Sequence, residues 1–506
     1  MRSKKALINT ITSILYELVA IICGLILPRL ILSRLGSSYN GITSSITQFI
    51  SCISLMKAGL FGVTRSALYE PLVKGDKEQV SSIIRTTESF MKKIALIFAV
   101  GVVIFAAIYP VFVSDEFEWL FSFTLVLIIG ISTFSQYYFG MTYSILLEAD
   151  QKKYITVIFQ IFCTILNTVI ASGLILLGFG IHAVKLVSAF AFTLYPIMIM
   201  LYARKHYDID LDAPQNDNLI AQRWDAFAQE AAFFVHNNTD VIVLTIFTNI
   251  KVVSVYTVYN YVISNLLKVI QTFITGFGAA FGNMLAKKEY DLVKENLKIY
   301  EVIIFSLSAI AYSTCLVLIV PFALLYTKGV SDINYAQPIF AVLVTIAGMF
   351  SCFRIPYKTV VDAAGHFKQM RNGALVEAAL NMLISVVCVN KFGLVGVAVG
   401  TLVATIFRSI QYAYYMMTVI VPINFLHFVG HVAVNLVTML LTYGLFVILK
   451  GYFTISLMSW ILEGVLCVIV STCITAIFNM LFYRVEFQKF IKKFVNIWRE
   501  KDGISR

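Results

Sequence analysis

Charge is scarce in this sequence. Only 13% of its 506 residues are Asp, Glu, Lys or Arg, whereas soluble domains carry about 25%. Hydrophobic residues make up 59% of the chain, and its mean hydropathy is +0.84. A soluble globule of this length still needs a polar surface. The composition therefore excludes a soluble enzyme and predicts an integral membrane protein.

Several chemical motifs are also missing. The eight cysteines contain no CxxC pair, so we interpret them as structural thiols. No Walker Gly-rich loop is present, so ATP does not drive this protein directly. His427 and His431 have the spacing of two ligands of one metal, but no third ligand lies near them in the sequence, and we interpret them as helix-packing histidines. We predict no catalytic residues, no metal site and no cofactor.

Long apolar runs fill most of the chain. Runs of roughly 20 residues or more are long enough to cross about 30 Å of hydrocarbon as helices, and the alternation of an outer-membrane barrel is missing. We therefore predict an all-α membrane fold with about fourteen spans. These spans cover residues 7–33, 41–66, 94–113, 119–147, 154–177, 181–203, 226–247, 254–285, 300–325, 336–360, 373–390, 394–417, 426–449 and 456–482.

Lys and Arg indicate the orientation of these spans. With both termini in the cytoplasm, the connections on that side hold 26 of them and the outer connections hold 5. This asymmetry follows the positive-inside rule. The net charge of +11 then faces the anionic inner leaflet, and we predict no nucleic-acid binding.

An internal repeat divides the chain. Residues 147–167 align with 361–381 at a shift of 214, and similar matches occur at shifts of 215 and 216. The repeat predicts two six-helix bundles of the same topology, related by a pseudo-two-fold axis along the membrane normal. The predicted parts are an N-terminal lobe 1–203, a cytoplasmic linker 204–223, a C-terminal lobe 224–417, two extra helices within 418–482, and an amphipathic basic tail 483–506.

Short motifs resemble those of a known transporter superfamily. They are residues 28–41, which begin Pro28-Arg29 and end Asn40-Gly41, residues 59–62 and 68–72, Asn238-Thr-Asp240, and the small-residue run 393–401. They resemble the multidrug/oligosaccharidyl-lipid/polysaccharide exporter superfamily, and within it the polysaccharide branch of Wzx-type flippases. The fourteen-helix form is also similar to the lipid II flippase branch.

The resemblance implies a function. It implies a flippase of the bacterial cytoplasmic membrane that moves undecaprenyl-pyrophosphate-linked oligosaccharide units by alternating access, for surface polysaccharide assembly. The implied partners are the lipid-linked oligosaccharide, membrane lipids, and a polysaccharide polymerase with glycosyltransferases, and we expect a monomer. The alternatives are a cation-coupled multidrug antiporter of the same superfamily and a membrane glycosyltransferase or polymerase.

Charges inside the spans are the candidate site residues, because each costs roughly 2.5–3.5 kcal/mol on insertion scales. Six cations facing one cavity would suit a pyrophosphate group. The alternative is that each pairs with a carboxylate and locks two helices. The six are Arg29, Lys57, Lys268, Arg354, Lys358 and Arg408.

Acidic residues suggest an ion-coupling site. Asp240 lies in the seventh span, and Glu377 and Asn381 are four residues apart in the eleventh. In the lipid II flippases a sodium site lies between these two helices, so the resemblance implies coupling to Na⁺ or, through a buried carboxylate, to H⁺. A salt bridge of Asp240 is the structural alternative.

Overall fold

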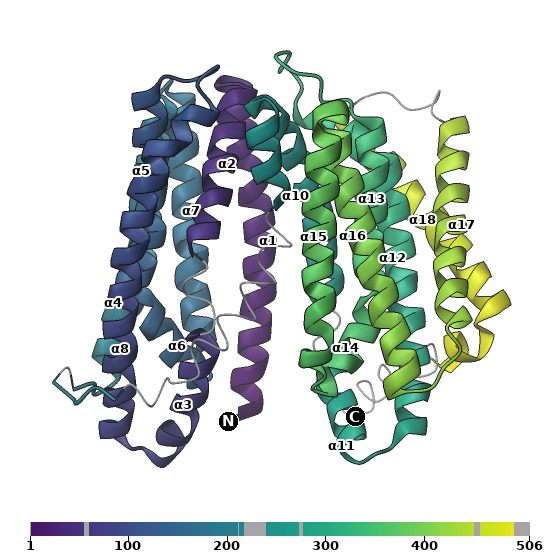
Figure 1. Ribbon diagram of the computed structural model, residues 1–506, viewed down its shortest axis with the longest axis horizontal. Helices are drawn as coiled ribbons and strands as arrows, with labels where there is room; N and C mark the ends of the chain where they lie inside the picture. Colours follow the sequence, from purple (N-terminus) through teal and green to yellow (C-terminus); the bar gives the residue numbers. More distant parts are fainter. Residues whose placement is uncertain are drawn as a thin grey trace, which may run out of the picture. The chain divides into compact units, whose positions relative to one another are not determined.

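Helices account for nearly all of the regular structure. A computed structural model describes residues 2–54, 60–210, 212–216, 239–272, 277–449 and 456–489. Within these ranges the chain forms helices and short connections and contains no strand, which confirms the predicted all-α class. Two compact units emerge, one comprising Met1–Val255 with Gly329–Ile333, the other Tyr256–Lys328 with Asn334–Arg506 (Figure 1).

The first unit is built from antiparallel helices joined by short connections. A further helix covers residues 239–247. The labelled elements are α1 (Arg2–Arg34), α2 (Ser37–Ile53), α3 (Leu60–Lys74), α4 (Lys77–Ile108), η2 (Tyr109–Phe112), α5 (Trp119–Ser135), η3 (Gln136–Gly140), α6 (Met141–Ala149), α7 (Lys153–Leu176) and α8 (Ile181–His206).

The second unit holds the helices that follow, including two that lie outside the sequence repeat. α10 (Ile250–Thr272) begins in the first unit and continues into the second. The remaining elements are α11 (Phe277–Ala286), α12 (Tyr290–Tyr326), α13 (Pro338–Phe353), α14 (Ile355–Ala363), α15 (Phe367–Phe392), α16 (Leu394–Tyr415), η5 (Met416–Ile420), α17 (Leu426–Leu449) and α18 (Leu457–Phe482).

The helix starts repeat along the chain. The starts of α6 and α14, and those of α7 and α15, are separated by the same shift that aligns the two copies in the sequence. The starts of α4 and α12, and those of α8 and α16, share a shift that is smaller by one position. The helix order therefore agrees with the sequence repeat. The predicted lobe boundaries at 203 and 224 stay a prediction.

Eleven helices in the described part of the chain are long and apolar enough to cross a membrane. They correspond to eleven of the fourteen predicted spans, and the other three (41–66, 226–247 and 254–285) include residues outside the described ranges. Two helices extend beyond their predicted spans 94–113 and 300–325, because α4 begins at Lys77 and α12 at Tyr290. Asp76 explains the first case, since its side chain accepts a hydrogen bond from the Gln79 N–H at 2.9 Å and caps the helix.

One of the added helices, α18, turns polar side chains inward and apolar ones outward. On α18 the buried residues recur every four positions, as Glu463, Cys467, Ser471, Thr475 and Asn479. Large apolar side chains of the same helix are exposed, among them those of residues 465, 469 and 481. This arrangement is the reverse of a soluble bundle and suits a surface of lipid. The chain is a multi-pass membrane protein.

The two added helices pack on α12. The Asn479 amide donates to Ser306 Oγ at 2.8 Å, and the Trp460 indole N–H donates to the Leu318 carbonyl at 3.2 Å. Each of these bonds joins α18 to α12. The predicted basic tail lies mostly outside the described residues, which end at residue 489.

Candidate functional site

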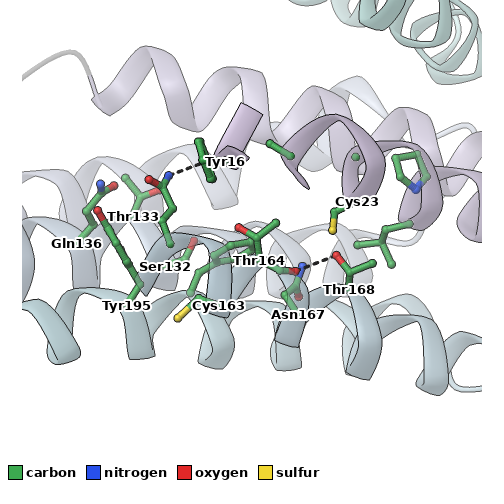
Figure 2. Close-up of a pocket in the computed structure, with 16 residues that line it drawn as sticks. Tyr16, Cys23, Ser132, Thr133, Gln136, Cys163, Thr164, Asn167, Thr168 and Tyr195 are labelled. Atoms are coloured by element: carbon green, nitrogen blue, oxygen red, sulfur yellow. Dashed lines mark hydrogen bonds between the residues drawn. The ribbon is translucent and has the colours of Figure 1, made fainter. Parts of the chain in front are cut away.

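A cavity of about 410 Å³ lies inside the first unit (Figure 2). Helices α1, α5, α7 and α8 and the π-helical segment η3 supply its walls. Its volume is within the range of about 300–1,000 Å³ that is usual for small-molecule sites. The lining residues are Tyr16, Ala20, Cys23, Gly24, Leu27, Pro28, Ser132, Thr133, Gln136, Gln160, Cys163, Thr164, Asn167, Thr168, Phe192 and Tyr195.

The lining of this cavity is uncharged and combines polar groups with a larger apolar surface. Among these sixteen residues, all of which the structure describes, there is no Asp, Glu, Lys or Arg. Amides and hydroxyls are present together with aromatic rings and aliphatic side chains. Such a surface can donate and accept hydrogen bonds and can stack against an apolar face, which suits a neutral, hydroxyl-rich ligand.

The polar wall of the cavity is formed by one face of α7. Gln160, Thr164, Asn167 and Thr168 stand at positions i, i+4, i+7 and i+8 of α7 and therefore share one face. Opposite them, the Gln160 amide donates to the Tyr16 hydroxyl of α1 at 2.8 Å. The buried Asn167 Oδ1 has no hydrogen-bond partner within the described part of the chain, so a ligand or water can use it.

Local irregularities shape two other walls. Pro28 has no N–H, so the helical hydrogen bond to the carbonyl of Gly24 is missing on the cavity side of α1. Gln136 begins a π-helical turn, a feature that is frequent at functional sites. Gly140, at the end of this turn, permits close packing, because a Cβ there would lie 2.3 Å from Pro196 Cβ.

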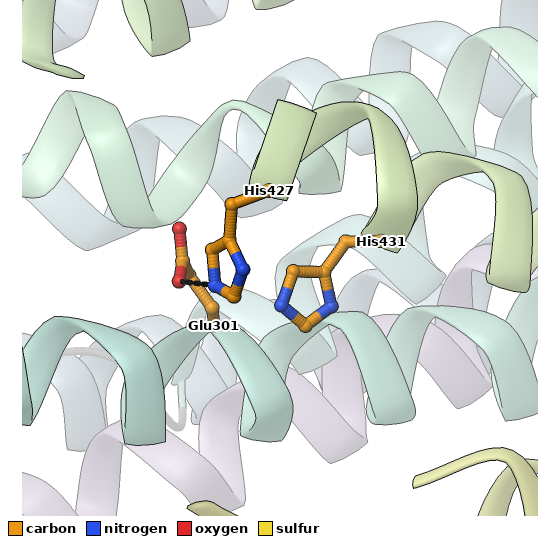
Figure 3. A group of neighbouring side chains, drawn as sticks. All are labelled: Glu301, His427 and His431. Atoms are coloured by element: carbon orange, nitrogen blue, oxygen red, sulfur yellow. Dashed lines mark hydrogen bonds and ion pairs between the residues drawn. The ribbon is translucent and has the colours of Figure 1, made fainter. Parts of the chain in front are cut away.

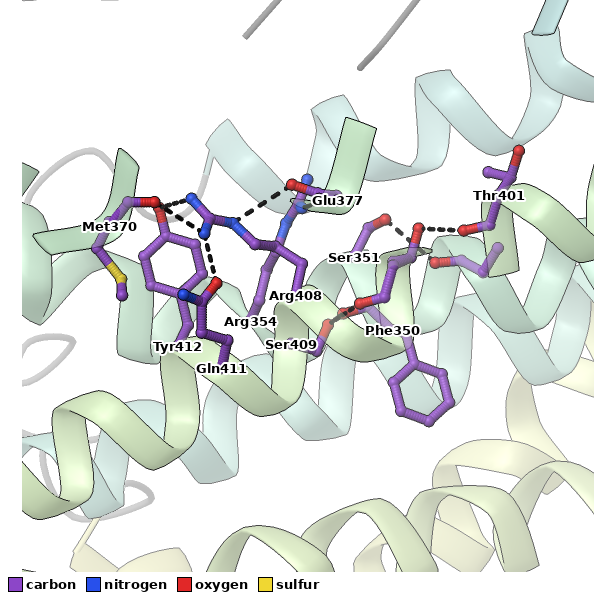
Figure 4. A network of polar contacts seen from close by, with 12 residues as sticks. Phe350, Ser351, Arg354, Met370, Glu377, Thr401, Arg408, Ser409, Gln411 and Tyr412 are labelled. Atoms are coloured by element: carbon purple, nitrogen blue, oxygen red, sulfur yellow. Dashed lines mark hydrogen bonds and ion pairs between the residues drawn. The ribbon is translucent and has the colours of Figure 1, made fainter. Parts of the chain in front are cut away.

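An ionic cluster lies in the second unit (Figure 4). Glu377 of α15 contacts two arginines, with its Oε1 2.8 Å from Arg354 Nη1 and its Oε2 3.3 Å from Arg408 Nε. Both ends of the carboxylate are therefore used, and the three side chains together carry one net positive charge. The structural alternative considered for the cations, a helix-locking salt bridge, is realised at these two arginines.

The Arg408 guanidinium forms three hydrogen bonds in addition to its contact with Glu377. Its guanidinium donates to the Met370 carbonyl at 3.1 Å, to Gln411 Oε1 at 2.5 Å and to the Tyr412 hydroxyl at 3.2 Å. Gly373 makes room for Gln411, because a Cβ at Gly373 would lie 1.8 Å from Gln411 Oε1. The Arg354 side chain is 18% exposed, compared with 6% for Arg408, so Arg354 has more freedom to meet a ligand.

The other predicted cations are dispersed. Arg29 is half-buried on α1 of the first unit, and Lys268 is exposed on α10 of the second. Lys358 of α14 forms an ion pair with Asp362 one turn later. Lys57 lies outside the described residues.

The predicted ion-coupling residues are all buried. Asp240 lies in the first unit, whereas Glu377 and Asn381 lie one turn apart on α15 in the second. Asn381 Oδ1 accepts hydrogen bonds from Ser385 Oγ at 3.1 Å and from Thr401 Oγ1 at 3.4 Å. A shared ion site of these residues stays a prediction.

Sequence reasoning missed the uncharged cavity, because the search for site residues followed charge. The polar face of α7, with two amides and two threonines inside an apolar span, was the available signal. Glu301 was also missed, although it lies within the predicted span 300–325 and is completely buried in α12.

No protein-family model and no curated protein matches the sequence. Solved structures do match. The lipid II flippase MurJ in an inward closed conformation superposes with a TM-score of 0.67 at 13% identity, covering 94% of this chain and 99% of that one. A multidrug resistance MATE family transporter matches in its inward-facing conformation with a TM-score of 0.63 at 13% identity, over 80% of this chain and 98% of that one.

An outward-facing conformation of a multidrug resistance MATE family transporter also matches. Its TM-score is 0.58 at 14% identity, over 82% of this chain and 95% of that one. The chain therefore has the fold shared by the MurJ flippase and the MATE transporters of the MOP superfamily. This fold agrees with the resemblance seen in the sequence.

Proposed function

We propose that this protein is a flippase that moves an undecaprenyl-pyrophosphate-linked oligosaccharide across the bacterial cytoplasmic membrane by alternating access. The uncharged polar cavity of the first unit is the observation that carries this proposal. Sugars present hydroxyls to amides and hydroxyls, and they present C–H faces to aromatic rings such as Tyr16, Phe192 and Tyr195.

The share of the chain covered by each structural match supports a lipid-linked substrate. The match to the lipid II flippase covers 94% of this chain, whereas the matches to the two MATE structures cover 80% and 82%. A further pair of helices would produce a difference of this kind. The proposal places the α17–α18 pair beside the lipid tail of the substrate.

Cations supply the second part of the proposed site. The proposal assigns the attraction of the pyrophosphate to Arg29, Lys57, Lys268, Arg354, Lys358 and Arg408. Within the ionic cluster, Arg354 is the best candidate for contacting the pyrophosphate. It shares Glu377 with Arg408, and part of its side chain is exposed. Arg408 is more buried; it contributes its charge to the cluster and holds Glu377 in place.

Ion coupling is the third part of the proposal. Asp240, Glu377 and Asn381 are proposed to bind Na⁺ or H⁺ during the cycle. Occupation of the Glu377 carboxylate by two arginines favours a role in which this ionic cluster rearranges, rather than one in which Glu377 alone takes up a proton.

A cation-coupled multidrug antiporter is the second candidate, supported by the MATE fold matches. Organic cations are best held by carboxylates and aromatic rings. The cavity of the first unit offers rings without a carboxylate, so it favours the neutral glycan.

Transport in proteoliposomes tests the proposal. The purified protein is reconstituted with a fluorescent undecaprenyl-pyrophosphate oligosaccharide, and translocation is followed by quenching of the probe in the outer leaflet. Gln160→Ala and Asn167→Ala each remove hydrogen bonds worth about 0.5–1.5 kcal/mol, so each should slow transport by up to about tenfold. Asn390→Ala, at an exposed position of α15, is the matched control and should transport as wild type does.

Two results would contradict the proposal. One is efflux of a cationic dye by the wild-type protein with no movement of any lipid-linked oligosaccharide, which would favour the multidrug antiporter. The other is oligosaccharide transport that is unaffected in a Gln160→Ala/Asn167→Ala double variant, which would place the sugar site elsewhere.

A further inference from the structure

Two histidines and a glutamate meet where α17 packs on α12 (Figure 3). His427 and His431 lie one turn apart on α17, and Glu301 lies on α12. One nitrogen from each ring and one carboxylate oxygen all lie within 4.8 Å of one another. The sequence offered no third ligand near the two histidines, and the fold supplies one from 126 residues earlier in the chain.

The cluster is buried and only partly satisfied. Glu301 is 0% exposed and His431 is 2% exposed. Glu301 Oε2 lies 3.0 Å from His427 Nε2, which accounts for one carboxylate oxygen. By geometry, Glu301 Oε1 and His431 Nε2 have no hydrogen-bond partner among the described residues, and neither has the buried hydroxyl of Tyr357 on α14, which lies beside Glu301. Buried polar atoms in proteins are almost always paired, so two unpaired atoms in one cluster point to a missing ligand.

The internal repeat provides a comparison for Glu301. Its counterpart is Glu88, at the same shift that separates the starts of α4 and α12, and Glu88 is buried in α4 of the first unit. Glu88 Oε1 lies 2.9 Å from Lys92 Nζ and 3.6 Å from Arg204 Nη2. That carboxylate is therefore compensated by two permanent cations.

Both of these cations are absent from the second unit. At the same shift, the residues equivalent to Lys92 and Arg204 are Phe305 and Met417. Within the described ranges no Lys or Arg forms an ion pair with Glu301, and the only ion-pair partner there is His427. A fully buried carboxylate needs a compensating positive charge. Beside Glu301 lie instead histidines from α17, a helix outside the repeat, and neutral imidazoles do not supply that charge.

We propose that Glu301, His427 and His431 bind a divalent transition-metal ion, with Zn²⁺ as the best match to the donor set. Two imidazole nitrogens and one carboxylate oxygen are typical ligands of Zn²⁺, and three protein ligands leave one coordination position for water. The ion compensates the charge of Glu301 and gives His431 Nε2 a partner. It also ties α17 to α12.

Neighbouring rings fix the orientation of His431. Its imidazole stacks on Tyr483 with centroids 3.9 Å apart and an interplanar angle of 6°, and Phe305 of α12 lies 4.8 Å away. Gly430 permits the approach of Tyr483, because a Cβ there would lie 3.2 Å from the Tyr483 hydroxyl. Such outer contacts hold a ligand ring in place before the metal binds.

Metal binding by the full-length protein tests this site independently of any transported substrate. The protein is purified in detergent through a tag without histidine, stripped with a chelator and titrated with Zn²⁺ and with Co²⁺ as a visible probe. We expect one ion per chain. Glu301→Gln and His431→Gln should each weaken binding at least about 100-fold, since even changes to outer-shell partners cost 10–100-fold. Zn²⁺ should also raise the melting temperature of the wild type and leave that of His431→Gln unchanged.

A matched control comes from the first unit. His182 is half-buried and its Nε2 lies 2.9 Å from Thr124 Oγ1, so His182→Gln also removes a histidine hydrogen bond, but it should bind the ion as wild type does. X-ray absorption of the wild-type zinc complex does not depend on the folding of any variant, and it should show nitrogen and oxygen ligands only. The proposal is overturned if the wild type binds no stoichiometric ion, if sulfur ligands appear, or if folded Glu301→Gln and His431→Gln bind like wild type; the cluster would then be a hydrogen-bonded helix contact only.

Discussion

Glu377 is the single residue on which the ionic cluster of the second unit depends. Its carboxylate compensates both Arg354 and Arg408, and all three side chains are largely shielded. Glu377→Gln removes the negative charge and leaves two cations facing each other. Breaking a buried ion pair from one side costs about 3–5 kcal/mol. We therefore expect a loss of that order in the free energy of unfolding, measured by denaturant titration in detergent micelles.

A weak ion pair nearby provides the control. Lys358 and Asp362 are one turn apart on α14, with side chains 43% and 33% exposed. Asp362→Asn should cost only about 0.5 kcal/mol, because exposed pairs of this kind contribute little. Equal losses in the two variants would show that the Glu377 cluster is no more than a surface contact.

Residue roles were predictable only where they depend on neighbours in sequence. The cost of charge in a membrane singled out Arg354, Glu377 and Arg408 as exceptional residues. Nothing in their spacing indicated that one carboxylate would hold both arginines, because the three come from different helices. Glu301 and His427 are 126 residues apart, and their meeting depends on how α17 packs on α12.

Helices were predictable as elements, because an apolar run of sufficient length has one stable form in lipid. The ends of the helices were less predictable. Charged residues of α4 that looked like a connection, such as Lys77 and Glu78, belong to the helix once Asp76 caps it. The walls of the uncharged cavity depend on the faces that α1, α5, α7 and α8 turn toward one another, which the run of hydropathy does not reveal.

The connection between α4 and α5 is tied to the starts of two other helices in the first unit. Glu116 accepts hydrogen bonds from Ser38 Oγ at 2.8 Å and Asn249 Nδ2 at 3.3 Å, and it lies 3.0 Å from Lys251 Nζ. Burial raises the pKa of Glu116, but the hydrogen bonds from Lys251, Ser38 and Asn249 and the charge of Lys251 together lower it more. The net pKa therefore lies below the ordinary value of 4.5.

This lowered pKa predicts a pH dependence of stability. The contribution of Glu116 is fully present above pH 4.5, the unfolded-state value, and is lost as the pH falls through the lower pKa of the folded state. Glu116→Gln should therefore cost about 1 kcal/mol near neutral pH, because the amide still accepts hydrogen bonds and only the interaction of the partly exposed charge with Lys251 is lost. Melting curves from pH 7 to pH 3.5 should show wild type and variant converging at the acidic end. A gap that persists or widens there would contradict the assignment.

The duplication is a property of the whole chain, and it could be predicted because both copies kept their spacing. The start of α7 at Lys153 and that of α15 at Phe367 are separated by the same shift that aligns residues 147–167 with 361–381. What the repeat could not predict is divergence within a copy. Glu88 and Glu301 occupy equivalent places, yet Glu88 pairs with Lys92 and Arg204, whereas Glu301 contacts His427.

Orientation in the membrane is also a whole-chain property, because it follows from the sum of the connections. The count of 26 Lys and Arg on one side against 5 on the other predicts that both termini are cytoplasmic, and an even number of spans places them on the same side. A green fluorescent protein fused after Arg506 should fluoresce, and alkaline phosphatase at the same point should be inactive. A truncation after Lys328, in a predicted outer connection, should give the opposite pair of results. If both fusion points report the same side, an even number of spans separates them, and the fourteen-span topology is wrong.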